Sequence, residues 1–230
     1  MILPDLESKL LGFGLHLRGL STITDEEMKL LQLTEPALIA LVGNVGSSYW
    51  PVFSSSFEYR DGLPDSLDRW SKRVAELLAN ELSLKAVYPF KGPPYLPFQQ
   101  WAKRAEPLSQ SPLGLMIHPQ YGLWHSYRFG LLIPADGLTL ATDAGEKRGP
   151  DTQSSCESCE TQPCLQSCPV AAFDINGYDV DGCAAYLKQN PEAACHVEGC
   201  LSRLACPVEE SFRYDAEQHC FHLRAFTAAR

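Results

Sequence analysis

The sequence predicts an α+β protein with two modules, a layered α/β domain followed by a smaller cysteine-rich domain. Helical and strand patterns alternate along the first part of the chain, and eight of the nine cysteines lie between residues 156 and 206. The stretch that joins these regions, residues 137–155, is rich in Gly, Pro, Asp and Ser and keeps no apolar period. A chain of 230 residues can form one substantial core and a small module. We therefore expect domains at residues 1–150 and 151–230.

Hydrophobic periodicity predicts the elements of the first domain. After a short first helix, residues 13–18 alternate between apolar side chains and polar ones or glycine, which indicates a half-buried strand. Residues 36–46 are continuously apolar and end in glycines, as expected of a central strand buried on both faces. Residues 65–82 have apolar side chains at helical spacing and predict an amphipathic helix capped by Asp65. Further apolar runs predict strands at residues 84–90, 113–117 and 129–133.

The cysteines form two segments, and each segment ends in Cys-Pro. Gaps of two, four and three residues separate those of the first segment, Cys156, Cys159, Cys164 and Cys168. Bacterial-type ferredoxins have gaps of two, two and three before the same Cys-Pro. Gaps of eleven, four and five residues separate those of the second segment, Cys183, Cys195, Cys200 and Cys206. This pattern predicts two 4Fe-4S clusters.

The Cys-Pro pairs also predict how the eight cysteines divide between the clusters. In two-cluster ferredoxins the Cys-Pro cysteine ligates the other cluster, because the proline turns the chain away from the first one. This crossed pattern assigns one cluster to Cys156, Cys159, Cys164 and Cys206. It assigns the other to Cys168, Cys183, Cys195 and Cys200.

Two other uses of the cysteines remain open at this point. A disulfide framework would require an oxidising compartment, whereas the first residues lack the pattern of a secretory signal. Zinc is the stronger alternative, because Cys-x-x-Cys with two further cysteines can form a tetrahedral site. The ninth cysteine, Cys220, lies on a predicted helix that starts near Asp215, where we expect it to act as a small buried hydrophobic residue.

Charge and hydropathy restrict the partners. No run approaches the ~20 apolar residues of a membrane span, so we expect a cytoplasmic protein that does not bind a membrane. The net charge is −9, and residues 151–230, with 12 acidic and 5 basic side chains, carry −7 of it. This acidic module is expected to repel nucleic acid and to attract a redox partner with a basic face.

A second group of residues lies around a Pro-Gln-Tyr-Gly turn within residues 112–134. Aromatic and histidine side chains on such a turn can line a flat cofactor. A simpler interpretation is an aromatic turn packed on a core, with His118 satisfied by local hydrogen bonds. The residue types alone do not name a cofactor.

This turn resembles a segment of the epoxyqueuosine reductases and of the CblC-type cobalamin chaperone. The matching residues are Ile117-His118-Pro119, Tyr121-Gly122, Trp124 and Arg128. The resemblance implies a nitroreductase-like first domain in which a cobalamin or a flavin such as FMN is bound by His118, Tyr121, Trp124 and Arg128.

The cysteine region resembles the reductases as well. A lone cysteine before a Tyr-Leu pair, as in Cys183-Ala-Ala-Tyr186-Leu187, follows the first Cys-Pro, and a last group ends in a second Cys-Pro. This similarity implies a ferredoxin-like module with the same crossed ligation. It covers residues 112–134 and 156–207. The gap after Cys159 is wider than in the reductases, and Glu106 is the only acid near the position of their catalytic aspartate.

Together these features predict an electron-transfer protein in which two 4Fe-4S clusters pass electrons to a cobalamin or flavin held by the first domain. If it is an enzyme, we expect an oxidoreductase related to epoxyqueuosine reductase that does not act on tRNA, because the helical-repeat tail of those enzymes has no counterpart here. The alternatives are a cobalamin-processing chaperone and a plain ferredoxin-type electron carrier with a vestigial pocket.

Overall fold

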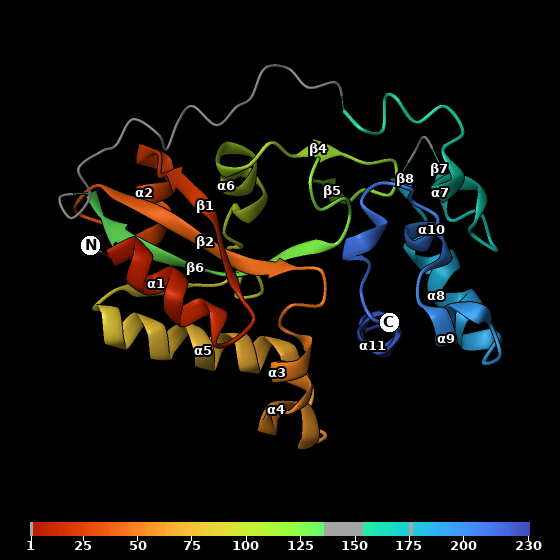
Figure 1. Ribbon diagram of the computed structural model, residues 1–230, viewed down its shortest axis with the longest axis horizontal. Helices are drawn as coiled ribbons and strands as arrows, with labels where there is room; N and C mark the ends of the chain where they lie inside the picture. Colours follow the sequence, from red (N-terminus) through yellow and green to blue (C-terminus); the bar gives the residue numbers. More distant parts are fainter. Residues whose placement is uncertain (1, 136–153, 175–176) are drawn as a thin grey trace. The chain divides into compact units, whose positions relative to one another are not determined.

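The computed structural model describes residues 2–135, 154–174 and 177–230. Its helices and antiparallel sheets confirm the predicted α+β class. The chain divides into two compact units, shown in Figure 1. The sheet unit comprises Met1–Pro107 and His125–Asp151, and the cysteine unit comprises Leu108–Trp124 and Thr152–Arg230.

This division differs from the predicted domains in one segment. Leu108–Trp124 packs with the cysteine unit, although it precedes residue 150 in the chain. The expected boundary near residue 150 lies outside the described residues. The sheet unit is therefore not continuous in the sequence, because Leu108–Trp124, which lies between its two segments, belongs to the cysteine unit.

The sheet unit is built on a four-stranded antiparallel sheet in the order β1-β2-β6-β3. Its central strand β2 is buried along nearly its whole length, as the continuous apolar run at residues 36–46 predicts. Helices α1 and α5 cover one face and α6 covers the other (Figure 1). The strands are β1 His16–Thr22, β2 Ala37–Val45, β3 Lys85–Val87 and β6 His125–Pro134. The helices are α1 Ile2–Leu11, α2 Asp25–Leu31, α3 Trp50–Ser54, α4 Phe57–Arg60, α5 Ser66–Leu82 and α6 Phe98–Ala105.

Local backbone geometry shifts one predicted boundary and changes one predicted cap. Strand β1 begins at His16 rather than at residue 13, because Gly14 adopts a left-handed φ of 65° in the turn after α1. A Cβ at Gly14 would lie 2.0 Å from the Ser48 carbonyl oxygen, so only glycine allows this approach. Helix α5 begins as predicted, but Asp65 has a left-handed φ of 54° instead of the extended conformation of a side-chain cap.

Short elements form the cysteine unit. Helix α11 packs against α8 and α9, and α10 packs against α7. The predicted strand at residues 113–117 is reduced to two residues that pair with β4. The strands are β4 Ser109–Gln110, β5 Met116–Ile117, β7 Phe173–Asp174 and β8 Gly177–Tyr178. The helices are α7 Pro163–Gln166, α8 Val180–Gln189, α9 Ala194–Glu198, α10 Leu201–Leu204, the 3-10 helix Glu210–Phe212 and α11 Ala216–Ala228. Within the described ranges of both units, no helix is long and apolar enough to cross a bilayer.

Candidate metal centre

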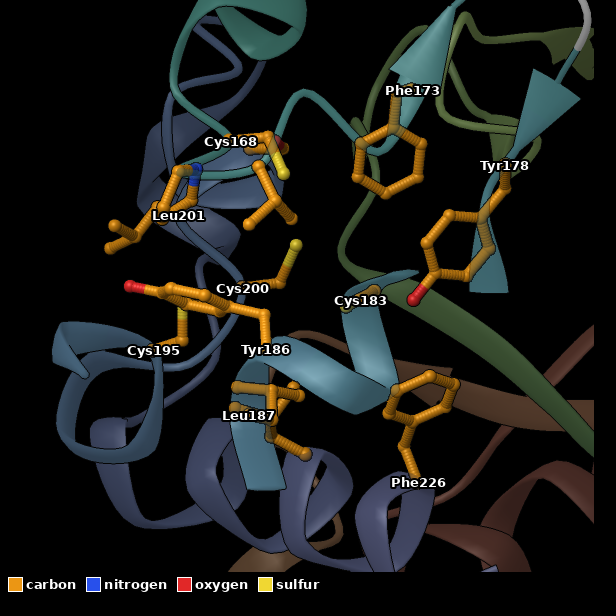
Figure 2. A pocket seen from close by; sticks show the side chains of 14 residues that line it. Cys168, Phe173, Tyr178, Cys183, Tyr186, Leu187, Cys195, Cys200, Leu201 and Phe226 are labelled. Carbon is orange, nitrogen blue, oxygen red and sulfur yellow. The ribbon is translucent and has the colours of Figure 1, made fainter. Parts of the chain in front are cut away.

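Two pockets of the cysteine unit are each bordered by four cysteines. The first pocket has about 280 Å³ of empty space, part of it open to solvent, and the second has about 480 Å³ (Figure 2). The cysteines of the first pocket, called here the first thiol group, are Cys156, Cys159, Cys164 and Cys206. Those of the second pocket, the second thiol group, are Cys168, Cys183, Cys195 and Cys200. The structure therefore brings together the same two sets of four that the crossed pattern predicts.

Electrostatic coupling follows the same division in the first thiol group. Burial raises the pKa of the Cys156, Cys164 and Cys206 thiols. Neighbouring thiolates of the same group raise it further: Cys206 acts on Cys156 and Cys164, and Cys159 acts on Cys206. Four thiolates in this space therefore repel one another unless a cation compensates their charge.

The second thiol group shows the same behaviour. Burial is again the main cause that raises the pKa of the Cys183, Cys195 and Cys200 thiols. Cys168 and Cys183 raise the pKa of Cys195, and Cys195 and Cys183 raise that of Cys200. The cysteines that raise the pKa of Cys183, Cys195 and Cys200 thus all belong to the same pocket.

Two short helices that pack against each other create the crossed arrangement. Cys164 lies in α7 and Cys168 follows the end of that helix, while Cys200 precedes α10 and Cys206 follows its end. Each helix therefore carries one cysteine of the first group and one of the second. The prolines after Cys168 and Cys206 restrict φ and direct the chain away from the pocket it has just lined.

The remaining cysteines of the second group come from α8 and α9. The Asp179 carboxylate caps α8 by accepting a hydrogen bond from the Gly182 N–H at 2.9 Å, which fixes the first turn that carries Cys183. Gly199, between α9 and α10, has a φ of 90°, and a Cβ there would lie 2.5 Å from the His219 ring of α11. Glycine at this position lets the loop between Cys195 and Cys200 lie against α11.

Backbone N–H groups are directed at the cysteine sulfurs. The Ala172 N–H donates to Cys168 Sγ at 3.3 Å. Hydrogen bonds from the Leu201 N–H to Cys195 and from the Ser202 and Arg203 N–H groups to Cys200 lower the pKa of these two thiols, although burial outweighs them. In the first group, the Leu165 N–H acts on Cys164 and the Val208 N–H on Cys206 in the same way. Such donors stabilise negative sulfur and are the usual surroundings of an iron-sulfur cluster.

The segment Leu108–Trp124 lines the first pocket with Pro112 and packs apolar side chains against two of its cysteines. Leu113, Ile117 and Leu123 form one hydrophobic cluster with Cys164 and Cys206. Gly122 has a φ of 56°, and a Cβ there would lie 2.4 Å from the Val208 carbonyl oxygen, so the turn packs closely on the chain after Cys206-Pro207. The sequence analysis did not predict that this segment packs on the cysteines. It interpreted the apolar side chains at residues 113–117 as a strand of the first domain.

Trp124, predicted to face a cofactor ring, is a core residue of the cysteine unit. Its side chain has an exposed fraction of 0%. The Arg203 guanidinium lies 4.9 Å from the Trp124 ring and 4.5 Å from the Tyr214 ring, and it donates a hydrogen bond to the Leu123 carbonyl. The stacked arginine ties α10, which links the two thiol groups, to the turn segment.

The other three residues predicted to bind a cofactor lie in two different units. His118 is buried, its Nδ1 accepts from the Gln120 N–H at 3.0 Å, and its ring stacks on Tyr121 at 4.4 Å. Tyr121 also contacts Phe212 edge-on. Arg128 belongs to the sheet unit, where it pairs with the Asp68 carboxylate at 2.5 Å and donates to Ser71 Oγ at 3.1 Å. The hydrogen bond of His118 is local, as the simpler interpretation of the turn expects, whereas Tyr121 and Arg128 also contact residues that are distant in the sequence.

The residues around the two thiol groups fit an iron-sulfur cluster in donor type and in space. Each pocket offers four thiols, sulfur-directed N–H groups and empty volume between them. In the part of the chain that the structure describes, no group of three or more His, Cys, Asp or Glu side chains converges on a single-ion site. No protein-family model matches the chain, and a search of the curated proteins finds no significant match.

His219 makes the stability of the cysteine unit sensitive to acid. Burial lowers the pKa of its imidazole to about 4, and the Arg203 charge acts in the same direction. Because this value lies below the unfolded pKa of 6.5, the stabilisation is complete above pH 6.5 and is lost as the pH falls toward 4.

We expect the unfolding free energy to fall by up to about 1.4 kcal/mol for each pH unit within that window. Denaturation curves of the wild-type protein and of His219→Phe at pH 7, 6 and 5 measure the effect. Because acid also attacks metal-sulfur sites, the difference between the two proteins is the relevant quantity. Parallel pH profiles would contradict the assignment to His219.

Proposed function

We propose that this protein transfers electrons through two 4Fe-4S clusters, one held by each thiol group. The observation that carries the proposal is the division of eight cysteines between two four-cysteine pockets, in the crossed pattern of two-cluster ferredoxins. Four thiolates are the full protein ligand set of one such cluster.

The dimensions of the pockets favour a cluster over a single zinc ion. A tetrahedral zinc site holds each sulfur about 2.3 Å from the metal, which draws the four sulfurs together and leaves no empty volume between them. The two pockets instead keep empty space beside the thiols, about 280 and 480 Å³ with the part open to solvent included. A multi-atom inorganic group fits such a space better than one ion does.

A bound 4Fe-4S cluster supplies a one-electron redox couple, and the side chains around the pockets determine its surroundings. Phe173, Leu187, Leu201 and Phe226 line the second pocket with apolar surface that limits the access of water (Figure 2). The packed helices α7 and α10 hold the two groups at neighbouring positions, which supports transfer from one to the other.

The charge of the cysteine-bearing region supports a redox partner with a basic face. Residues 151–230 carry a net charge of −7, and exposed acidic side chains such as Glu157, Glu160 and Asp181 lie close in sequence to the cysteines. Complementary charge accelerates the encounter of two proteins, whereas the same charge repels nucleic acid.

Metal and sulfide analysis tests the proposed function. Protein prepared and reconstituted without oxygen is expected to be brown and to contain about eight irons and eight acid-labile sulfides per chain. Cys220→Ser is the matched control: the Cys220 thiol is buried and donates to the Val197 carbonyl at 2.8 Å, away from both groups, so this variant is expected to keep all eight irons. Stoichiometric zinc with negligible sulfide would refute the proposal.

The cobalamin or flavin site implied by resemblance stays a prediction. The nitroreductase-like and ferredoxin-like arrangements also stay predictions. The antiparallel sheet between helices supports the first, and the crossed cysteine groups support the second. Titrating the iron-loaded protein with hydroxocobalamin and with FMN at micromolar concentrations tests the site. Binding would add a reductase or chaperone role for that cofactor, and the absence of binding by both would leave a ferredoxin-type electron carrier.

A further inference from the structure

Two hydroxyl groups border the second pocket in addition to its four thiols. Ser202 lies on α10 and has an exposed fraction of 1%, and its Oγ has no hydrogen-bond partner among the described residues. Tyr178 lies on β8, with its hydroxyl directed toward Cys183 (Figure 2). The Tyr178 hydroxyl therefore offers an O–H donor to whatever the second pocket holds, and Ser202 adds a buried hydroxyl on a residue that lines the pocket.

The Tyr178 ring is held in this orientation by its neighbours. It stacks on Phe173 with ring centroids 4.5 Å apart and an interplanar angle of 12°, and Phe226 lies 6.2 Å away on another side. Because the ring lies between side chains of β7 and α11, its hydroxyl cannot rotate away from the pocket without losing these contacts.

Leaving a buried hydroxyl without a hydrogen bond is unfavourable, so the Ser202 hydroxyl is better explained by an acceptor that the pocket holds. Cluster sulfides and cysteine thiolates are such acceptors. A hydrogen bond to sulfur stabilises the more negative, reduced state of a cluster, and therefore raises its reduction potential.

The two thiol groups differ in the number of donors around them. The second group has the Ala172, Leu201, Ser202 and Arg203 N–H groups together with the two hydroxyls. Among the described residues around the first group, donors that act on sulfur include the Cys164, Leu165 and Val208 N–H groups and the Ser154 hydroxyl, and no second hydroxyl is found among them. This difference favours a higher potential in the second pocket.

We propose that the hydroxyls of Tyr178 and Ser202 donate hydrogen bonds to sulfur in the second cluster and make it the first of the two to be reduced. The inference rests on the proposed function, because it requires a cluster in each pocket. Each cluster gains one electron from a one-electron donor, which is dithionite in the test below. The two O–H bonds stay intact and no group is transferred.

Redox titrations of the iron-loaded, full-length protein, followed by EPR, test the proposal. Tyr178→Phe and Ser202→Ala are each expected to lower the higher of the two potentials. At a given solution potential, the ratio of reduced to oxidised second cluster should fall about tenfold, equivalent to ~59 mV for a one-electron couple. The lower potential should stay unchanged.

Tyr95→Phe is the matched control. Tyr95 belongs to the sheet unit, is 68% exposed and lines neither pocket, so removing its hydroxyl should move neither potential. Iron and sulfide content is measured for every variant, so that a changed potential is not confused with a lost cluster. Ser202→Ala, the smaller change, remains informative if Tyr178→Phe loses iron.

The possible failures are distinguishable. Unchanged potentials in both hydroxyl variants, with about eight irons retained, would overturn this inference and leave the proposed function intact. A shift of the lower potential instead of the higher one would overturn the order of reduction. Wild-type protein without iron and sulfide would refute the proposed function itself.

Discussion

We expect a variant that lacks both Cys156 and Cys206 to keep one complete 4Fe-4S cluster, and a variant that lacks both Cys200 and Cys206 to keep none. The first pair belongs to one thiol group, so its loss leaves the other group with four ligands. The second pair takes one ligand from each group. Neither cluster then has its full set of four thiolates.

The comparison separates crossed from local ligation because Cys206 is six residues from Cys200 but fifty from Cys156. Local ligation would place Cys200 and Cys206 on the same cluster and predicts the opposite result for both variants. Alanine is used at each position because a serine oxygen can replace a thiolate. Iron and sulfide content, with the EPR spectrum of the reduced protein, reports the complete clusters. Cys220→Ser again serves as the unaffected control.

The second large effect is expected in the core of the sheet unit, where Arg18 and Glu106 form a buried ion pair. Their side chains have exposed fractions of only 2% and 8%, and Arg18 Nη2 lies 2.9 Å from Glu106 Oε1. Arg18 Nη1 also donates to the Asn44 carbonyl at 2.7 Å, and the Tyr127 hydroxyl donates to the Glu106 carboxylate. Burial raises the pKa of Glu106, while Arg18 and the Tyr127 hydrogen bond oppose that rise.

Glu106→Leu is expected to destabilise the protein by about 3–5 kcal/mol, because it leaves the Arg18 charge buried without its carboxylate. Adding Arg18→Met should recover a large part of the loss, since both charges are then replaced by apolar groups of similar size. Urea denaturation followed by circular dichroism measures the free energies of unfolding.

An exposed ion pair provides the matched control. Lys72 and Glu76 lie one helical turn apart on α5, 3.6 Å from each other, with more than half of each side chain exposed. Lys72→Gln is therefore expected to change stability by no more than about 0.5 kcal/mol. A Glu106→Leu variant that loses no more than this control, or a double variant less stable than Glu106→Leu, would contradict the role assigned to the buried pair.

Elements with a strong local period could be predicted from the sequence. The continuous apolar run of β2 and the helical spacing of α5 both report how many faces of an element are buried, and the structure agrees in both places. The start of β1 was missed because Gly14 fits closely against Ser48, a residue 34 positions away. Hydrophobic periodicity does not predict such a long-range contact.

The cysteine spacing and the two Cys-Pro pairs predict two sets of four thiols, and one of these sets borders each pocket. A short helix brings the cysteines near its two ends to different groups, and the proline after the second of them turns the chain away. The hydrogen-bond donors around the sulfurs were beyond the sequence argument. Ser202 and Tyr178 lie 24 positions apart in the sequence, and only the packing of α10 and β8 makes both of them line one pocket.

Residues 112–134 contain one contact that is local in the sequence and several contacts that depend on tertiary packing. The sequence offered an aromatic turn with a locally satisfied His118 as the simpler of two interpretations, and the observed hydrogen bond of His118 closes over two residues. Tertiary packing places Trp124 against Arg203 in the cysteine unit and pairs Arg128 with Asp68 in the sheet unit. Local sequence patterns do not predict these contacts. The partners of these two side chains lie 60 or more positions away, so they depend on how the chain closes its long loops. The spacing of apolar residues predicts which face of an element is buried, whereas long-range packing determines which residues cover that face.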